Sequence, residues 1–366
     1  MAVKDAPLRS SAASGSRRRL PGPDVVRAVA LIGVVVMNYH GYLILRGGSR
    51  STDTVVGRLF DPWTGPLATR FAATFVLVAG VGVTLMTRRA LGDPARVREL
   101  RWTLVRRGLL LYLGGLFLEE IWPGTIIPFY GGMFVIAAAL FTLRSRWLLA
   151  VGVVAALAGW AIRTWRFWRA EDGDSMAWLT SPGGSARGYV FDLFVNGTHP
   201  LLPWLAFMCA GMLLGRILTV AWWRPATLGA GFALYSVSTM MAATATTEFQ
   251  LTVLSTDPYD RGLVYLANAL GTALIAYAVI DWLAEWFTTA LDPLRRAGQM
   301  TLTLYIAHVL VFNFVVDWMG WIEPGGLDIA LAFALAFWVA GIATATWWSR
   351  HLGRGPAERV YRMIGG

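Results

Sequence analysis

Long apolar runs separated by short charged segments dominate the chain. A membrane-spanning α-helix needs about 20 predominantly apolar residues, and about ten runs approach that length. They are 24–44, 70–87, 104–121, 125–143, 147–164, 200–218, 226–245, 262–287, 300–318 and 327–348. The pattern predicts an all-α integral membrane protein, a polytopic helical bundle of about ten transmembrane helices. Residues 24–348 form this single domain, 1–23 a disordered basic N-terminus, and 349–366 a C-terminal tail.

The distribution of charge predicts how the bundle sits in the membrane. Only 15% of the residues are charged, against about 25% in soluble domains, which excludes an ordinary soluble enzyme. With the N-terminus inside, 22 of the 32 basic residues fall in inner segments, as the positive-inside rule requires. We predict cytoplasmic N- and C-termini (N-in/C-in), and attribute the net charge of +10 to orientation rather than nucleic acid. The single lysine among the basic residues suggests a GC-rich bacterial source, hence the bacterial inner membrane.

The first predicted helix holds the richest set of polar residues, which are costly within a membrane and therefore candidates for function. Asp24 and Arg27 are three residues apart and can pair on one face, either as an interfacial ion pair or at a substrate. Arg27 and Asn38 share a face, about 16 Å apart. His40 is about 200° away from Asn38 in an unbroken helix. A break at Gly41 would turn it inward.

Other ionisable residues are also candidates. His308 lies in mid-membrane, as a proton acceptor or as a neutral structural histidine. His199 begins a helix beside prolines, as a cap or as a base. Glu119 and Glu120 end a helix on the outer side, as an exposed acidic rim or as a paired-carboxylate base.

Arginines on both sides of the membrane add binding candidates. Arg70 lies on the outer side, to pair with Asp61 or an outer glutamate, or to hold an anionic substrate. Arg106 and Arg107 belong to an inner cluster that attracts anionic lipid or binds the phosphates of a cytosolic donor. We expect no metal, because no Cys/His cluster has ligand spacing. Gly80-x-Gly82 and Gly211-xxx-Gly215 predict close helix contacts.

Several motifs occur in family order along the chain. They are Asp24-x-x-Arg27-Ala28-x-Ala30-Leu31-x-Gly33-x(4)-Asn38, Phe75-x(4)-Gly80-x-Gly82, Arg106-Arg107 followed by Phe129-Tyr130-Gly131, His199-Pro-Leu-Leu-Pro-Trp204, Gly211-Met-Leu-Leu-Gly-Arg216, Gly298-Gln-Met300-Thr-Leu-Thr-Leu-Tyr305 and Gly355-Pro356-Ala-Glu358. The combination resembles the YeiB-like family of unknown function numbered 418. It is also similar to the transmembrane acyltransferases related to heparan-alpha-glucosaminide N-acetyltransferase and to the acyltransferase-three group.

This resemblance implies transfer of an acyl group from cytosolic acyl-CoA, with acetyl-CoA as the first candidate, to a glycan or lipid acceptor on the far side. It adds Tyr130 to the substrate-binding candidates, and Arg106 and Arg107 as donor-binding residues. Acyltransferase-three relatives place a catalytic histidine where this chain has Asn38. Since an amide is no base, the base is His40, Glu119 or Glu120, His199 or His308, with His40 preferred.

Two other classes of function stay open. In a proton-coupled transporter for a small metabolite, Arg27, Asn38 and His308 would line the path, with His308 as the proton relay. In a membrane assembly subunit, no transfer occurs. The expected partners are the bilayer, acyl-CoA and the acceptor, with a homodimer as an open option and no nucleic acid.

Overall fold

The computed structural model describes residues 21–174, 179 and 185–366. Most of the segment expected to be disordered, residues 1–20, lies outside that range. Throughout the described part of the chain the regular structure is helical, without a strand. The all-α prediction is confirmed.

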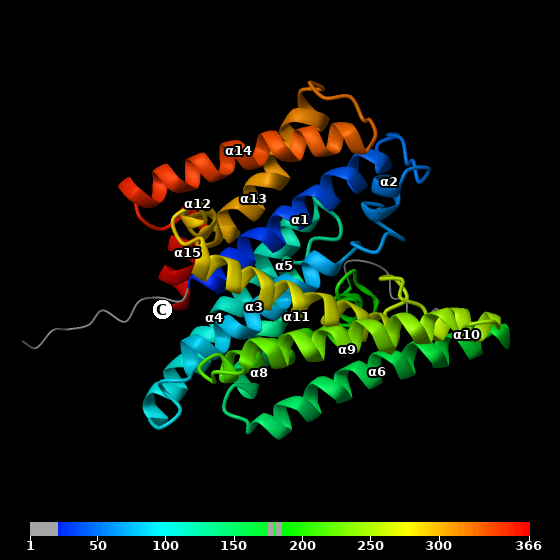
Figure 1. Cartoon of the computed structure of the whole chain (residues 1–366), viewed down its shortest axis with the longest axis horizontal. Helices are drawn as coiled ribbons and strands as arrows, with labels where there is room; N and C mark the ends of the chain where they lie inside the picture. Colours follow the sequence, from blue (N-terminus) through cyan, green and yellow to red (C-terminus); the bar gives the residue numbers. More distant parts are fainter. Residues whose placement is uncertain (1–20, 175–178, 180–184) are drawn as a thin grey trace, which may run out of the picture.

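Ten helices correspond to the ten predicted spans (Figure 1). They are α1 (Gly22–Leu45), α3 (Arg70–Thr87), α4 (Pro94–Glu119), α5 (Ile127–Leu140), α6 (Ser145–Glu171), α8 (Leu201–Ile217), α9 (Trp223–Ala243), α11 (Leu263–Trp286), α13 (Thr301–Phe312, continued by the π-helical η2, Asn313–Trp318) and α14 (Leu327–His351). The shorter elements are α2 (Val55–Leu59), α7 (Ala186–Phe191), the π-helical η1 (Asp192–Asn196), α10 (Glu248–Val253), α12 (Asp292–Gly298) and α15 (Pro356–Gly365).

The expected count of about ten spans is not confirmed. Within the described ranges, seven helices are long and apolar enough to cross a membrane, or eight if the bent α7–η1 and α8 pair forms one span. The two remaining helices are α4 and α5. The first half of α4 is rich in arginine, and α5 has 14 residues, about 21 Å of helix, against an apolar core of about 30 Å. The chain is therefore a multi-pass membrane protein with seven or eight spans by length and composition.

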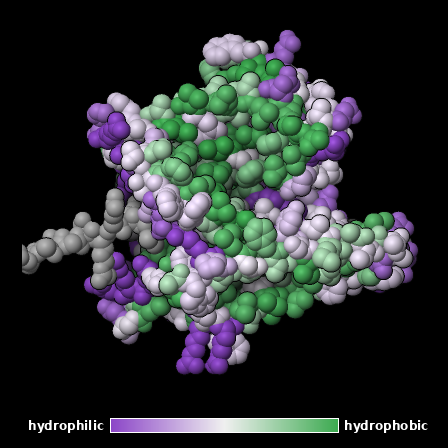
Figure 2. Space-filling view, viewed as in Figure 1, coloured by the Kyte–Doolittle hydropathy of each residue, from purple (hydrophilic) through white to green (hydrophobic). Residues whose placement is uncertain are grey.

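Helix α1 forms the centre of the bundle and contacts α3, α11, α12, α13 and α14. By contrast, α6 and α9 bury only 17% of their most apolar stretches, and both lie at the lower edge of the bundle in Figure 1, where α6 packs on α8 and α9 packs on α11. Figure 2 shows a broad hydrophobic face with hydrophilic residues gathered towards its margins. Because apolar side chains point outward there, this is the surface expected to meet lipid.

The packing of α3 against α8 depends on glycine. A Cβ on Gly211 would lie 1.9 Å from the carbonyl oxygen of Leu77, and one on Gly80 would lie 2.2 Å from that of Met208. No larger residue fits at either position without moving the helices apart. The prediction of close helix contact is confirmed for Gly80, Gly211 and Gly215 but not for Gly82, whose Cβ would meet only the Arg27 guanidinium, at 3.4 Å.

The two ends of the bundle differ in what they contain. We call the end that holds Gly22, α12 and α15 the terminal end, and the end that holds α2 and α10 the opposite end (Figure 1).

Candidate functional site

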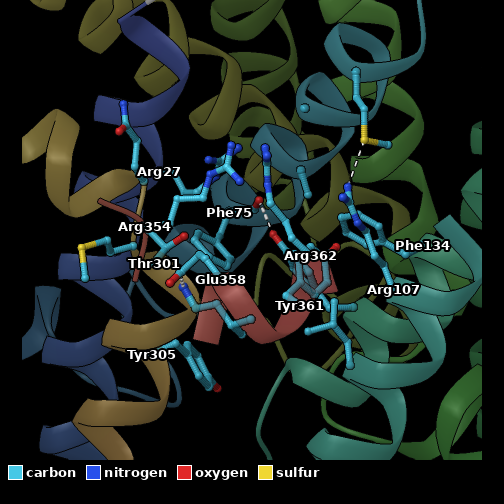
Figure 3. A pocket seen from close by; sticks show the side chains of 18 of the residues that line it. Arg27, Phe75, Arg107, Phe134, Thr301, Tyr305, Arg354, Glu358, Tyr361 and Arg362 are labelled. Carbon is cyan, nitrogen blue, oxygen red and sulfur yellow. Dashed lines mark hydrogen bonds between the residues drawn. The ribbon is translucent and has the colours of Figure 1, made fainter. Parts of the chain in front are cut away.

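A cavity of about 620 Å³ opens at the terminal end and is lined by α1, α3, α4, α5, α12, α13, α14 and α15. We call it the terminal cavity; Figure 3 shows several of its side chains. Six arginines line it: Arg27, Arg107, Arg295, Arg296, Arg354 and Arg362. Glu358 is the one carboxylate among the lining residues. Its volume falls in the usual range for ligand pockets, about 300–1,000 Å³.

The carboxylate of Glu358 is committed to the protein. It accepts hydrogen bonds from the backbone N–H groups of Leu302 (2.8 Å) and Thr303 (3.1 Å), and from the Thr303 hydroxyl (2.5 Å). These bonds fasten α15 to the first turn of α13, where a negative charge is favoured. Asp24 pairs with Arg27, and Asp292 pairs with both Arg295 and Arg296, so acidic residues outside the lining offset part of the positive charge of the cavity.

Arg27 is held at the cavity wall by its own helix and by α12. Its guanidinium pairs with Asp24 (3.3 Å) and donates to the carbonyl of Gly298 (3.5 Å), while Gln299 donates to Asp24 (3.0 Å). The predicted pairing of Asp24 with Arg27 is formed. It positions Arg27 beside the cavity.

Two further candidates from the sequence line this cavity. Arg107 donates to the carbonyl of Gly366 (2.8 Å) and lies over the ring of Tyr361. Tyr130 donates from its hydroxyl to the carbonyl of Phe75. Arg106, the neighbour of Arg107, is exposed and does not line the cavity.

A second cavity, of about 270 Å³, lies towards the opposite end. We call it the opposite cavity. None of its lining residues is charged. Asn38 and His199, both candidates from the sequence, lie in its wall together with Thr69, Thr198 and Tyr259.

Tyr305 of α13 lines both cavities. Its hydroxyl is bonded to that of Thr125 (2.9 Å) and accepts from the N–H of Ile126 (3.3 Å), and the residue is only 2% exposed. In Figure 3 it lies apart from the arginines. One buried tyrosine thus borders a cavity at each end of the bundle.

Asn38 is joined to His308, with 3.2 Å between the amide nitrogen and Nε2. His308 Nδ1 contacts the carbonyl of Tyr305, which can only accept, so Nδ1 carries the proton. Nε2 of the neutral ring therefore accepts from the Asn38 amide. Both nitrogens of His308 are occupied, and the side-chain oxygen of Asn38 is left for a ligand.

His199 is oriented by a chain of hydrogen bonds. The Thr198 hydroxyl donates to the carbonyl of Gly124 (3.3 Å), and His199 Nδ1 lies 3.0 Å from that hydroxyl oxygen. In the tautomer that uses the hydroxyl proton on the carbonyl, Nδ1 is the donor and Nε2 keeps its lone pair. His199 is thus the imidazole of the opposite cavity with a nitrogen able to accept a proton.

Three further candidates lie outside both cavities, as do Asp24, Arg106, Glu120 and His308. Because α1 continues unbroken to Leu45, His40 points away and bonds through Nδ1 to the carbonyl of Phe60 (2.8 Å). Arg70 is buried against the ring of Tyr265 and donates to three acceptors, the nearest at 2.9 Å. It does not pair with Asp61, which Arg50 binds instead. Glu119 lines neither cavity.

Sequence reasoning missed Tyr305 and the four arginines contributed by α12, by α15 and by the loop before α15. These arginines lie in segments whose basic charge is already explained by the orientation of the protein in the membrane; they are Arg295, Arg296, Arg354 and Arg362. Tyr305 ends the motif that begins at Gly298, but it is uncharged and therefore did not stand out as a candidate for function. Among the described residues, no group of three or more His, Cys, Asp or Glu is placed to hold a metal ion; the absence of a metal stays a prediction.

The helical bundle and its two cavities define a polytopic membrane protein with an internal site. The family model for "Heparan-alpha-glucosaminide N-acetyltransferase, catalytic" matches residues 19–246, more than half of the chain, and the chain therefore belongs to that family. The model "Protein of unknown function (DUF418)" matches residues 214–365. The resemblance to a YeiB-like family related to transmembrane acyltransferases is confirmed, and the chain is acetyltransferase-like. A comparison with curated proteins found no match.

The two matched ranges meet across the site. Arg27, Asn38 and His199 fall in the acetyltransferase range, whereas Tyr305 and His308 fall in the DUF418 range. Both cavities are built from residues of the two ranges.

Proposed function

We propose that the protein is an integral-membrane acyltransferase that moves an acyl group, acetyl in the first instance, from cytosolic acyl-CoA to an acceptor such as a sugar or glycolipid on the far side or within the membrane. One observation carries this proposal: Tyr305 lines two cavities that lie towards opposite ends of the bundle. A donor and an acceptor that approach from different sides would meet there.

The terminal cavity would bind the donor. Guanidinium groups bind phosphates through paired, charge-assisted hydrogen bonds, and coenzyme A carries phosphates at the end remote from its thioester. With the phosphates among the six arginines, the acyl end would extend towards Tyr305. The terminal end would then face the cytosol, in keeping with the positive-inside rule and with cytoplasmic termini in a bacterial inner membrane.

The opposite cavity would hold the acceptor and the base. We assign the base to His199, in place of His40, because its Nε2 is free in the wall of that cavity. Asn38, fixed by His308, would hold the acceptor or stabilise the oxyanion, as a neutral amide can. His308 is a positioning residue in this scheme.

The reaction balances with these groups. His199 Nε2 takes the proton from the acceptor hydroxyl or amine as its oxygen or nitrogen bonds to the thioester carbonyl carbon. The carbon–sulfur bond then breaks and the thiolate leaves towards the terminal cavity. The proton on His199 is available to it, which regenerates the neutral imidazole.

The first test is donor binding by the full chain in lipid nanodiscs. We expect acetyl-CoA to bind at least about tenfold more tightly than S-acetylpantetheine, which has the same thioester but no phosphate, since charge-assisted hydrogen bonds contribute about 1.5–3 kcal/mol each. Release of free thiol from acetyl-CoA with glucosamine as a probe acceptor measures turnover. Absence of any acetyl-CoA binding would refute the proposal.

A proton-coupled transporter is the second candidate, because two cavities separated by one side chain also suit alternating access. His308 would be its relay, yet both nitrogens of that ring are engaged in hydrogen bonds. Uptake into proteoliposomes that follows a pH gradient and is lost in His308→Ala would favour the transporter. The lipid bilayer is the partner that the helices imply, and a homodimer remains a prediction.

A further inference from the structure

A third cavity, of about 270 Å³, lies beside the opposite cavity, and we call it the side cavity. It is lined by α6, η1, α8 and α10, and by the segment that precedes α11. Tyr259 lines both the side cavity and the opposite cavity. The side cavity is therefore the next space along from the proposed acceptor site.

Positive charge exceeds negative charge in the wall of the side cavity. Arg163, Arg166 and Arg261 line it, with Asp260 as the one acidic lining residue. Asp260 pairs with Arg163. Among the described residues, neither Arg166 nor Arg261 has a carboxylate partner within ion-pair distance, so two guanidinium charges remain uncompensated.

Neutral oxygens hold these two arginines from one side. Arg166 donates to the side-chain oxygen of Asn196, and Arg261 donates to the backbone carbonyls of Val195 and Asn196 at 3.4 Å each. A guanidinium has five N–H donors, and one or two are used in each case. The remaining donors suit an anion with several oxygens.

The backbone conformation of Arg261 supports a functional role for this residue. Its φ of 53° is in the left-handed region, which a residue with a long side chain adopts at a cost. Thr69 is the other described residue except glycine with a positive φ, and it lines the opposite cavity. Both strained positions thus border the proposed acceptor path.

The outer surroundings of the side cavity are apolar. Ile162 and Phe167 of α6 and Pro203 of α8 complete its wall, and α6 belongs to the side of the bundle that faces lipid. Arginines beside an apolar wall suit an amphiphilic ligand, because the arginines can bind its charged headgroup while the wall contacts its hydrocarbon. A fully water-soluble ligand would gain nothing from that wall.

We propose that the side cavity binds the phosphate-type oxyanion of a lipid-anchored acceptor, which enters beside α6, is held by Arg166 and Arg261, and extends its hydroxyl or amine past Tyr259 into the opposite cavity. The identification of the bound lipid as an acyl acceptor rests on the proposed acyltransferase function. The oxyanion site itself can be tested without any turnover.

The experiment is native mass spectrometry of the full chain in detergent, titrated with phosphatidylglycerol, with phosphatidylcholine of the same acyl chains, and with glycerol 1-phosphate. We expect Arg166→Gln/Arg261→Gln to weaken phosphatidylglycerol binding at least tenfold and phosphatidylcholine binding less, because the choline cation offsets the charge of the phosphate in that lipid. Arg169→Gln is the matched control, since Arg169 lies on the same helix, pairs with Asp174 and does not line the cavity. The arginines of the terminal cavity also attract anions. The result is therefore the difference in phosphatidylglycerol affinity between Arg166→Gln/Arg261→Gln and Arg169→Gln.

The outcomes separate the parts of the proposal. Equal phosphatidylglycerol affinity in the double variant and the control would overturn the site. Equal affinity for glycerol 1-phosphate and phosphatidylglycerol would overturn the lipid source. Arg166→Lys/Arg261→Lys guards against misfolding, because it keeps both charges and is expected to retain most of the binding. If the unsubstituted protein bound phosphatidylglycerol as expected but released no thiol from acetyl-CoA, only the acyltransferase function would be refuted.

Discussion

The terminal cavity and the opposite cavity meet at one tyrosine but are built from different chemistry. The terminal cavity has about 620 Å³ and six arginines, whereas the opposite cavity has about 270 Å³ and no charged lining residue. Charge suits recognition of a large polyanion, whereas the opposite cavity keeps His199 neutral, because burial and then the charge of Arg261 lower the pKa of that imidazole to about 3. Under the proposed function, this contrast corresponds to donor binding at one end and chemistry at the other.

Loss of the imidazole in the opposite cavity is the strongest way to break this contrast. We expect His199→Ala to lower kcat for acetyl transfer about 100- to 10,000-fold, as general-base removal does, with acetyl-CoA affinity unchanged. Thiol release and equilibrium binding measure the two effects. His351→Ala is the control, since His351 is exposed on α14 and outside both cavities. If His40→Ala proved equally damaging, the assignment of the base would be wrong.

Removal of one charge from the terminal cavity tests the other half of the contrast. Arg107→Gln is expected to raise KM for acetyl-CoA about tenfold or more, the effect of one charge-assisted hydrogen bond, with kcat little changed. Arg106→Gln provides a neighbour on the same helix that does not line the cavity. Equal effects of the two substitutions on KM would show that the basic surface, rather than the cavity, attracts the donor.

The partition between the cavities can be tested at Tyr305. Tyr305→Phe removes the hydroxyl bonded to Thr125 and to the N–H of Ile126. An unsatisfied buried donor costs about 1–3 kcal/mol, so we expect a lower Tm with donor binding retained. Tyr305→Ala should in addition join the two cavities and admit a small fluorescent solute across proteoliposomes. A sealed Tyr305→Ala protein would contradict the view that this residue alone separates them.

The smallest effect is expected at Asp61, which precedes Pro62 and Trp63 in the wall of the opposite cavity. Burial raises the pKa of Asp61, but the bonds from Arg50 and from the N–H groups of Thr64 and Trp63 outweigh burial and lower that pKa to about 2. The carboxylate therefore stabilises the fold fully above its ordinary pKa, and this contribution is lost as the pH falls towards 2. We expect Asp61→Asn to lower Tm by a few degrees at pH 7. The loss of Tm should shrink only under strong acid; a loss that already shrank between pH 7 and pH 5 would exclude this cause.

Much of the fold followed from local pattern. The ten apolar runs all form helices, and the glycines of α3 and α8 make the close contact that their spacing predicted. The count of about ten spans is not confirmed, because apolarity alone does not report helix length: α5 is apolar but has only 14 residues. Arg27 and Asn38 were found because polar groups in apolar helices stand out, but the sequence did not show that they line different cavities.

The sequence by itself determined the class of protein, the helices, the family and the richest polar helix, because hydropathy, periodicity and motifs are properties of neighbouring residues. Tertiary structure decided which polar groups work together. The packing of α1 against α13 places Asn38 beside His308. Hydrogen bonds of the Thr198 hydroxyl with Gly124 and with His199 orient that imidazole. The packing of α15 against α13 adds Arg354 and Arg362 to the cavity that Arg27 lines. These contacts join residues far apart in the chain, and no local pattern specifies them.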